Sequence, residues 1–241
     1  MKIALIGYGK MGRVVEEVAQ ARGHTIVAKI DPNGPHKTPT AEALHDAHVC
    51  IDFSHPSCAV NNIKQLVALG KDIVMGTTGW YSHLEEITGL IHQNPVGLIY
   101  SPNFSIGVNL FLQIVSEAAS LINAFESYDV GVFEAHHNKK ADSPSGTAKA
   151  IAKTVLNRMS RKRVLVEGQV EGQIAKDALQ ISSLRCGSIP GTHSVIFDSP
   201  ADTITLTHEA RSREGFAIGA VAAAEWVHGR KGLYTIEDMF N

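Results

Sequence analysis

The first hundred residues alternate between short apolar runs and stretches with helical spacing, and this alternation limits the fold more than any other feature. The runs expected to form strands are Lys2–Ile6, Thr25–Ile30, Val49–Phe53, Ile73–Met75 and Gly97–Tyr100. Between them, Met11–Arg22 and Ala59–Leu69 repeat apolar side chains every three or four residues, as amphipathic helices do. Strands separated by helices predict a parallel sheet with right-handed crossovers.

The pattern changes after Ser105. A long apolar helix is expected over Ile106–Phe125, and a second helix over Thr147–Met159. The strands expected in this half are Tyr128–Glu134, Arg163–Gly168, Leu179–Arg185, Thr192–Phe197 and Thr203–His208. Such an order predicts an α+β domain built on a mixed or antiparallel sheet. The closing Ala-rich helix, Phe216–Val227, is expected to return to the first domain.

Composition excludes several classes of protein. Of the 241 residues, 44% are hydrophobic and 19% are charged, and the net charge is −2, so neither disorder nor nucleic-acid binding is indicated. No apolar run reaches the length of a membrane span, and the apolar start is too short for a signal-peptide core. Cys50, Cys58 and Cys186 form no CxxC pair. We therefore expect reduced thiols and a cytoplasmic location.

The first strand–helix junction carries the glycine-rich turn Gly7-Tyr8-Gly9-Lys10-Met11-Gly12. The first glycine permits a tight turn, the second lets a pyrophosphate approach the backbone, and the third lets the helix pack on the strand. The helix N-terminus offers free N–H groups to the phosphates. We expect these six residues to bind a dinucleotide, in a Rossmann-like domain of residues 1–104 plus 214–241. An α+β domain on a mixed sheet is expected over residues 105–213.

An acidic residue, Asp31, ends the second expected strand. A carboxylate at this position typically accepts hydrogen bonds from the adenosine ribose hydroxyls and repels a 2′-phosphate, which favours NADH. Lys10 and Lys29 are nearby cations that would still admit NADPH. The alternative is that Asp31 is only a turn residue before Pro32.

Two further loops follow expected strands of the first domain. They are Gly76-Thr77-Thr78-Gly79 and Ser101-Pro102-Asn103-Phe104. Ligands of open α/β sheets bind beyond the carboxyl ends of the strands, so Gly76–Thr78 and Ser101–Phe104 are candidate nicotinamide contacts. Ordinary turn chemistry is the alternative, because Gly, Thr, Pro and Asn all favour turns.

The segment from Glu134 to Ala148 holds the densest set of chemically active residues. The pair His136-His137 supplies groups that titrate near neutrality, and Lys139-Lys140 adds positive charge. Ser145-Gly146-Thr147 opens the expected helix, where backbone N–H groups favour a carboxylate. One short stretch thus offers a general acid, cations and an anion-binding turn.

Each part of this segment has a simpler interpretation. Ser143 or Ser145 can serve only as a helix N-cap, and the lysine pair can be a solvated loop. Adjacent histidines can ligate a metal, but no Cys, Asp or Glu at a familiar zinc spacing joins them. We therefore expect no metal site.

The pattern E-A-H-H-x-x-K-x-D-x-P-S-G-T-A over residues 134–148 closely resembles the signature of the dihydrodipicolinate reductases, also called 4-hydroxy-tetrahydrodipicolinate reductases. Other segments resemble that family in the same order along the chain. They are Gly76–Gly79, Asn103–Asn109, Arg185-x-Gly187-x-Ile189-x-Gly191-x-His193 and Ser212-Arg213. The resemblance covers most of the chain.

This resemblance implies an oxidoreductase of lysine and diaminopimelate biosynthesis. Its reaction would be the NAD(P)H-dependent reduction of dihydrodipicolinate, or of its hydrated form, to tetrahydrodipicolinate. The second domain would bind this small cyclic dicarboxylate and hold a homotetramer together. By the same resemblance, His136 is the proton donor, and Lys140 and His137 belong to the substrate site. Gly146 and Thr147 match the carboxylate-binding turn, and Arg213 matches an arginine near the domain hinge, here placed with the cofactor residues.

The chain departs from the family pattern around the cofactor turn. Many members have one more residue in the glycine turn and an arginine before its Met-Gly, where this chain has Lys10. Many also carry an arginine beside the acidic residue after the second strand, where Pro32 and Asn33 follow Asp31. Both differences bear on the choice between NADH and NADPH more than on the activity.

Two other classes of function share part of this pattern. Another two-domain dehydrogenase of amino or keto acids would have the glycine turn but would not need the segment from His136 to Thr147. A non-enzymatic dinucleotide sensor would need a DNA-binding or partner module, and neither a basic patch nor spare sequence supplies one.

Overall fold

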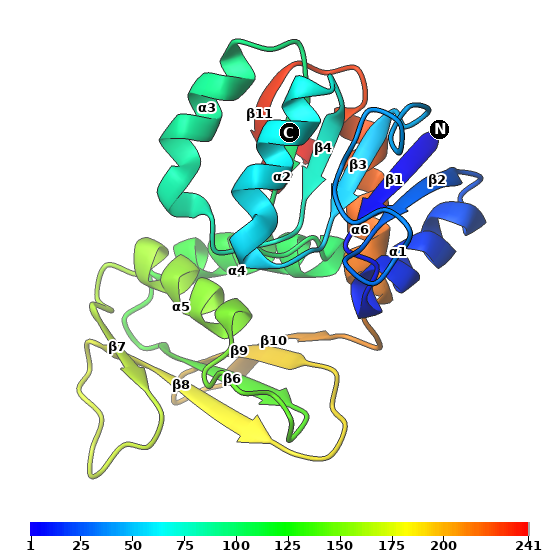
Figure 1. Ribbon diagram of the computed structural model, residues 1–241. Helices are drawn as coiled ribbons and strands as arrows, with labels where there is room; N and C mark the ends of the chain where they lie inside the picture. Colours follow the sequence, from blue (N-terminus) through cyan, green and yellow to red (C-terminus); the bar gives the residue numbers. More distant parts are fainter. Residues whose placement is uncertain (241) are drawn as a thin grey trace. The chain divides into compact units, whose positions relative to one another are not determined.

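The alternating apolar runs of the first half form a six-stranded parallel sheet in the computed structural model, which describes residues 1–240 (Figure 1). Its strands are β1 (Lys2–Ile6), β2 (Thr25–Ile30), β3 (Val49–Asp52), β4 (Asp72–Met75), β5 (Gly97–Tyr100) and β11 (Gly232–Thr235). They lie in the order β11-β5-β4-β3-β1-β2. Since β2 and β3 flank β1 on opposite sides, the chain changes direction there, and ligands of open parallel sheets bind beside such a point.

Helices cover both faces of this sheet. They are α1 (Lys10–Ala21), α2 (Pro56–Ala68), α3 (Leu84–His92) and α6 (Glu214–Val227). Val15 of α1 and Val221 of α6 belong to one buried apolar cluster, and Ile63 of α2 and Ile91 of α3 belong to another. With β11, these elements make one compact unit of residues 1–106 and the segment from Arg213 onward.

The second unit, Gly107–Ser212, is built on a five-stranded mixed sheet. Its strands, in the order β10-β9-β6-β8-β7, are β6 (Asp129–His136), β7 (Val164–Glu167), β8 (Ala178–Arg185), β9 (Thr192–Asp198) and β10 (Thr203–Glu209). β6 is antiparallel to β9 and parallel to β8. The helices of this half are α4 (Ile106–Ile122) and α5 (Gly146–Arg158). The mixed sheet and the parallel sheet confirm the predicted α/β fold class.

The two faces of the mixed sheet differ in composition. Val195 and Phe197 of β9 point into a core completed by Val115 of α4 and Ile151 of α5. Alternate side chains of a strand point to opposite faces, so the other face carries Ile196 with Leu184 and Val164, all of them exposed. These large exposed apolar side chains therefore mark a face that the sequence pattern alone did not identify.

Two elements were missed in the prediction from sequence. Helix α3 is nine residues long and contains Gly89, which weakens its helical pattern. Strand β11 is four residues long and half-buried, and it is defined by its parallel pairing with β5 at the edge of the sheet. Neither α3 nor β11 has a local sequence pattern strong enough to predict it without the neighbouring elements against which it packs. Among residues 1–240, no helix combines the length and apolarity needed to cross a membrane.

Gly219 lies where α6 passes the backbone of Phe104, and a Cβ there would be 1.7 Å from the carbonyl oxygen of Phe104. We expect Gly219→Ala to destabilise the protein by about 1–3 kcal/mol, because the helix and the loop must move apart. Gly89→Ala is the matched control, since a Cβ on this other helical glycine meets no described atom within 4 Å. It should stabilise by about 0.5–1 kcal/mol. Urea unfolding checks both changes, and equal effects would contradict the packing argument.

Candidate active site

The glycine-rich turn after β1 has the close contacts that its glycines predict. Gly7 has a φ of +87°, and a Cβ there would lie 2.4 Å from the carbonyl oxygen of Phe53. A Cβ on Gly12 would lie 2.4 Å from the carbonyl oxygen of Gly7. A side chain at either position would therefore push α1 or the turn away from the sheet.

Gly9 differs from these two glycines, because it faces open space. It is the N-cap of α1, and none of the described side chains caps the helix at this end. A Cβ on Gly9 would meet none of the atoms of residues 1–240 within 4 Å. The first turn of the helix contains no acidic residue. The N–H groups of α1 are thus left for an anion, as binding of a pyrophosphate requires.

Asp31 is held against this turn. Its carboxylate accepts hydrogen bonds from the backbone N–H of Asn33, at 3.0 Å, and of Tyr8, at 2.9 Å. These bonds lower the pKa of Asp31. The turn interpretation therefore holds for Asp31, and it does not conflict with the ribose interpretation, because an ionised carboxylate at the end of β2 is also an acceptor. Lys29 lies 2.7 Å from Glu16, so its charge is already paired, whereas Lys10 is exposed.

In the loop after β4, Thr77 turns its side chain into the protein. Its hydroxyl donates to Asp52 at 2.7 Å and accepts from the N–H of Ser54 at 2.8 Å. Asp52 is fully buried, and this burial raises its pKa. Thr78 is exposed, and Gly76 lies against the Phe53 ring. Thr77 therefore holds the loop, and contact with a ligand would fall to backbone groups and to Thr78.

The loop after β5 is ordered in a similar way. The Ser101 hydroxyl donates to the carbonyl of Asn103 at 2.8 Å and accepts from its N–H at 3.0 Å. Phe104 is buried in the core of the first unit, and Pro102 is exposed. The side chains of Ser101 and Phe104 thus serve the fold. Arg213, the residue just before α6, is exposed.

A buried carboxylate lies at the centre of the residues brought together in the second unit. Glu134 of β6 has no exposed surface. Its Oε1 accepts from the N–H of Ser145 at 3.0 Å, the Ser183 hydroxyl at 2.7 Å and Nη2 of Arg185 at 2.8 Å. Burial alone would raise the pKa of Glu134, but hydrogen bonding to the Ser145 side chain, Arg185, Ser183 and the Ser145 backbone outweighs it and holds the pKa at about 2. Glu134 is therefore an anion at physiological pH.

His136 lies two residues further along β6, on the same face as Glu134. Its Nδ1 is 3.1 Å from Oε2 of Glu134. Its ring meets the ring of His193, on β9, edge to face, with centroids 5.0 Å apart. Burial lowers the pKa of His136, and the charge of Glu134 opposes this effect. Lys140 makes an ion pair with Asp142 at 2.8 Å. His137, which follows His136 in the chain, is half-buried.

The turn Ser145-Gly146-Thr147 begins α5, as predicted. The Ser145 hydroxyl accepts from the N–H of Ala148 at 3.1 Å, so the simpler interpretation of this serine, an N-cap, holds for its side chain. Gly146 is exposed, and a Cβ there meets none of the described atoms within 4 Å. An anion approaching this helix end would meet backbone N–H groups rather than a side chain.

The sequence prediction did not include Glu134, Arg185 and His193 among the site residues. Glu134 and His193 share a cross-strand register position, and Arg185 pairs with His136 on the neighbouring strand. The available signals were the alternation of Glu134 and His136 along one strand and the motif from Arg185 to His193.

The side chains around Glu134 are also of the types that coordinate metal ions. Glu134, His136 and His193 each offer one ligand atom within 4.8 Å of the others. The expectation of no metal was based on His136 and His137, and the structure uses His193 instead of His137 in this group. The Arg185 guanidinium, bound to the same carboxylate, opposes a second cation at this point.

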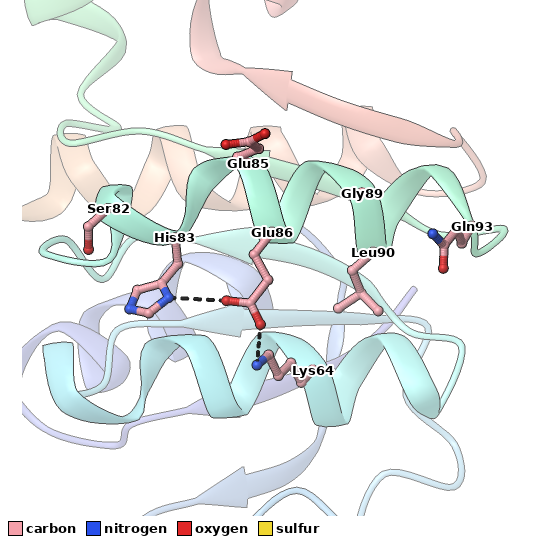
Figure 2. A pocket seen from close by; sticks show the side chains of 8 residues that line it. All are labelled: Lys64, Ser82, His83, Glu85, Glu86, Gly89, Leu90 and Gln93. Atoms are coloured by element: carbon pink, nitrogen blue, oxygen red, sulfur yellow. Dashed lines mark hydrogen bonds and ion pairs between the residues drawn. The ribbon is translucent and has the colours of Figure 1, made fainter.

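A groove on the first unit, between α2 and α3, contains none of the predicted site residues. Figure 2 shows Glu86 between His83, at 3.1 Å, and Lys64, at 2.5 Å. The groove is otherwise lined by Ser82, Glu85, Gly89, Leu90 and Gln93. The charge of Glu86 is thus paired within the groove, and nothing there converges on an open centre.

Comparison with known proteins gives the same family over both units. The family model described as "Dihydrodipicolinate reductase, N-terminus" matches residues 1–104, and the model of the C-terminus matches residues 107–240. A 4-hydroxy-tetrahydrodipicolinate reductase of Christiangramia forsetii is 37% identical over 100% of this chain and 98% of its own length. One of Staphylococcus haemolyticus is 36% identical over 99% of this chain and 100% of its own length.

Solved structures agree with these relatives. The dipicolinate-bound dihydrodipicolinate reductase of Paenisporosarcina sp. TG-14 superposes with a TM-score of 0.80 at 25% identity, covering 98% of this chain and 97% of its own. GenD2 from gentamicin A biosynthesis, solved with NAD, has a TM-score of 0.62 at 14% identity and covers 99% of this chain and 89% of its own. That second likeness concerns the fold alone.

His193 makes a pH-dependent contribution to stability that can be measured. Burial, and then the neighbouring His136, lower its pKa from 6.5 to about 4. As the pH falls below 6.5, the unfolded state takes up the proton first, so the folded state loses stability until the pH reaches about 4. The loss can reach about 3 kcal/mol.

Urea unfolding at a series of pH values should show a smaller loss over this interval in His193→Asn than in the wild type. His92→Asn, which changes an exposed histidine, should leave the slope unchanged. Equal slopes in the wild type and His193→Asn would contradict the prediction.

Proposed function

Because this chain belongs to the dihydrodipicolinate reductase family, we propose that it reduces a small cyclic dicarboxylate with a nicotinamide dinucleotide, using His136 as the proton donor. The observation that carries the proposal is the convergence of His136 with the N-terminus of α5 around one buried carboxylate. A proton donor beside an anion-binding turn suits a substrate that carries carboxylates and must be protonated.

The cofactor residues are proposed to be those of the glycine turn, Asp31, the two loops after β4 and β5, and Arg213. The fit of the turn is supported by Gly9, whose open side and uncapped helix leave room and N–H donors for a pyrophosphate. Bound NAD(P)H supplies the hydride. Asp31, ionised and fixed to the turn, favours NADH because it would repel a 2′-phosphate.

The substrate carboxylates are proposed to bind the second unit. The dipicolinate in the Paenisporosarcina relative shows that a cyclic dicarboxylate binds that protein. In this chain, Lys140 supplies positive charge, and the turn at Gly146 and Thr147 supplies backbone N–H donors, with His137 assisting. Ser145, whose own N–H is bound by Glu134, positions this turn. Lys140 is paired with Asp142 only at the surface, so its ammonium can bind a substrate carboxylate at small cost.

The proton step is assigned to His136. Addition of hydride to the unsaturated ring leaves negative charge on the conjugated system, and the adjacent carbon takes up a proton. The imidazolium of His136 gives this proton: its N–H bond breaks, a C–H bond forms on the substrate, and the imidazole is left neutral. Positive charge at Lys140 and the α5 amides stabilises the anion formed in between.

A homotetramer is proposed through the uncovered face of the mixed sheet. Val164, Leu184 and Ile196 are 49%, 47% and 37% exposed on that face. Large apolar side chains gathered on one exposed face are typical of a surface that another protein covers. Other copies of this chain are the simplest cover, because most oligomers are symmetric assemblies of one chain, and the number of four comes from the family resemblance.

His136→Gln should lower kcat by about 10²–10⁴-fold with little change in KM, because a general acid is lost while the carboxylate-binding groups remain. Lys140→Ala is the comparison, and it should raise KM and also lower turnover, because Lys140 binds a substrate carboxylate and stabilises the anion. Initial rates of NADH oxidation with freshly generated dihydrodipicolinate precursor, and inhibition by pyridine-2,6-dicarboxylate, measure both. Unchanged turnover in His136→Gln would reject its role as proton donor.

Asp31→Asn should raise the ratio of kcat/KM for NADPH to kcat/KM for NADH by about tenfold, which corresponds to roughly 1.4 kcal/mol of lost repulsion toward a 2′-phosphate. The amide keeps the size of the side chain and one acceptor for the N–H of Tyr8. Asp46→Asn, which removes an exposed charge of the same unit, should leave the ratio unchanged. A ratio that is equal in all three proteins would show that Asp31 is only a turn residue.

A further inference from the structure

The two oxygens of the Glu134 carboxylate have different surroundings. Oε1 accepts the three hydrogen bonds from Ser145, Ser183 and Arg185. Oε2 is buried and has no hydrogen-bond donor among residues 1–240. A buried carboxylate oxygen without a donor is costly, and such an atom calls for a functional explanation.

Nδ1 of His136 lies 3.1 Å from this oxygen. Nδ1 is itself buried, and within the described part of the chain it makes no hydrogen bond, so the pair lies at ion-pair distance without hydrogen-bond alignment. The other neighbour, Nε2 of His193, is further away, at 3.8 Å, and lies 3.2 Å from the Ser145 hydroxyl. His136 is therefore the closer of the two histidine rings on this side of Glu134.

We propose that Glu134 is a positioning residue for the proton donor: its Oε2 holds a proton on Nδ1 of His136, so that Nε2 is the atom that delivers the transferred proton. A small rotation of the ring aligns the pair. The inference rests on the proposed function, because it concerns how His136 performs its step. A carboxylate beside an imidazole fixes the ring's tautomer and stabilises its protonated form in the same way in other enzymes.

The surroundings of Nε2 agree with this assignment. A Cβ built on Gly191 would lie 3.0 Å from Nε2 of His136. The glycine therefore leaves this side of the ring without a side chain, whereas the Nδ1 side is closed by Glu134. Of the two ring nitrogens, Nε2 is therefore the one that we assign to face the substrate.

The charges around His136 explain why the carboxylate matters. Lys140 and Arg185 are cations that disfavour the imidazolium, and Asp142 and Glu134 are anions that favour it. His193, the other ring in contact, adds no anion to this balance. Burial also disfavours the charged ring. Glu134 is the one of these two anions that is both buried and within ion-pair distance, so its removal should lower the pKa of His136.

Glu134 also links the proton donor to the substrate turn. Its Oε1 holds the N–H of Ser145, the N-cap of α5, while its Oε2 faces His136. One side chain thus sets the position of the group that donates the proton and of the helix end that would bind a carboxylate. Glu134 and His136 can share this task because they are two residues apart on one strand and point to the same face.

Glu134→Gln separates the two functions of the side chain. The amide oxygen can still accept from Ser145, Ser183 and Arg185, but the amide nitrogen now faces Nδ1 and donates to it. A general acid must be protonated, so the rate falls as pH rises through its pKa. With a lower pKa, this falling limb of the kcat profile should move to lower pH by about 1 unit or more. We expect kcat at neutral pH to fall by about 10²-fold or more, with a smaller change in KM.

Ser183→Ala is the matched control. It removes one of the three donors to Oε1 and leaves the Oε2 side intact, so the falling limb should stay at its wild-type pH. A limb that stays in place in Glu134→Gln, or that moves equally in both variants, overturns the proposal. If His136→Gln abolishes turnover while Glu134→Gln keeps the wild-type profile, the proposed function stands and this inference fails. If His136→Gln is itself fully active, the proposed function fails.

A measurement on the wild-type protein covers the case in which Glu134→Gln does not fold. ¹⁵N NMR of histidine-labelled protein, with His136 assigned by its absence in His136→Gln, reports the tautomer of the neutral ring above its pKa. The Nδ1–H tautomer is expected. The Nε2–H tautomer, which leaves Oε2 of Glu134 without a donor, would overturn the proposal.

Discussion

The burial of the Glu134 carboxylate is the constraint on which the second unit depends. An ionised carboxyl removed from water is stable only where donors replace the lost hydration. Here the donors come from β8, through Ser183 and Arg185, and from the start of α5, through Ser145. β6, β8 and α5 must therefore meet at one place, and the meeting creates the surroundings of His136.

The two units use helix N-termini in different ways. α1 begins at Gly9 without a side-chain cap among the described residues, so its N–H groups are left for a ligand. α5 begins at Ser145, whose hydroxyl caps the N–H of Ala148 while its own N–H is bound by Glu134. The N-terminus of α1 is open, which suits a charged diphosphate. At the N-terminus of α5, the charge of Glu134 already offsets part of the positive potential, which suits a carboxylate that is oriented there rather than strongly attracted.

Local patterns were sufficient to predict much of the fold. The apolar runs that form β1, β2 and β5 have sharp boundaries in the sequence. The glycine turn is recognisable because close backbone contacts require glycine at Gly7 and Gly12. Pairings between distant strands were not predictable in this way. His193 reaches Glu134 through the antiparallel register of β9 with β6, which no local pattern encodes. For the same reason, β11 is recognisable as a strand only through its pairing with β5.

Several residues predicted as ligand contacts have a structural role in the loops. Thr77, Ser101 and Phe104 follow strands whose carboxyl ends face the expected ligand, yet their side chains are buried and hold their own loops. A sequence motif indicates that a certain residue type is required at a position. It does not distinguish a residue that supports the loop from one that contacts a ligand. Asp52, buried beneath Thr77, has no ligand role in the prediction, although it accepts the bond that shapes this loop.

The burial of His136 and the charge of Glu134 act against each other, and their balance suits a proton donor. Burial removes competing water and lowers the pKa of the ring, which weakens its hold on the proton. A fixed anion raises the pKa again and selects which nitrogen is protonated. A histidine exposed to solvent would need neither effect, but its ring would not be oriented. Enclosing a carboxylate and two histidine rings lowers folding stability, and under the proposed function it gives a proton donor with a defined direction.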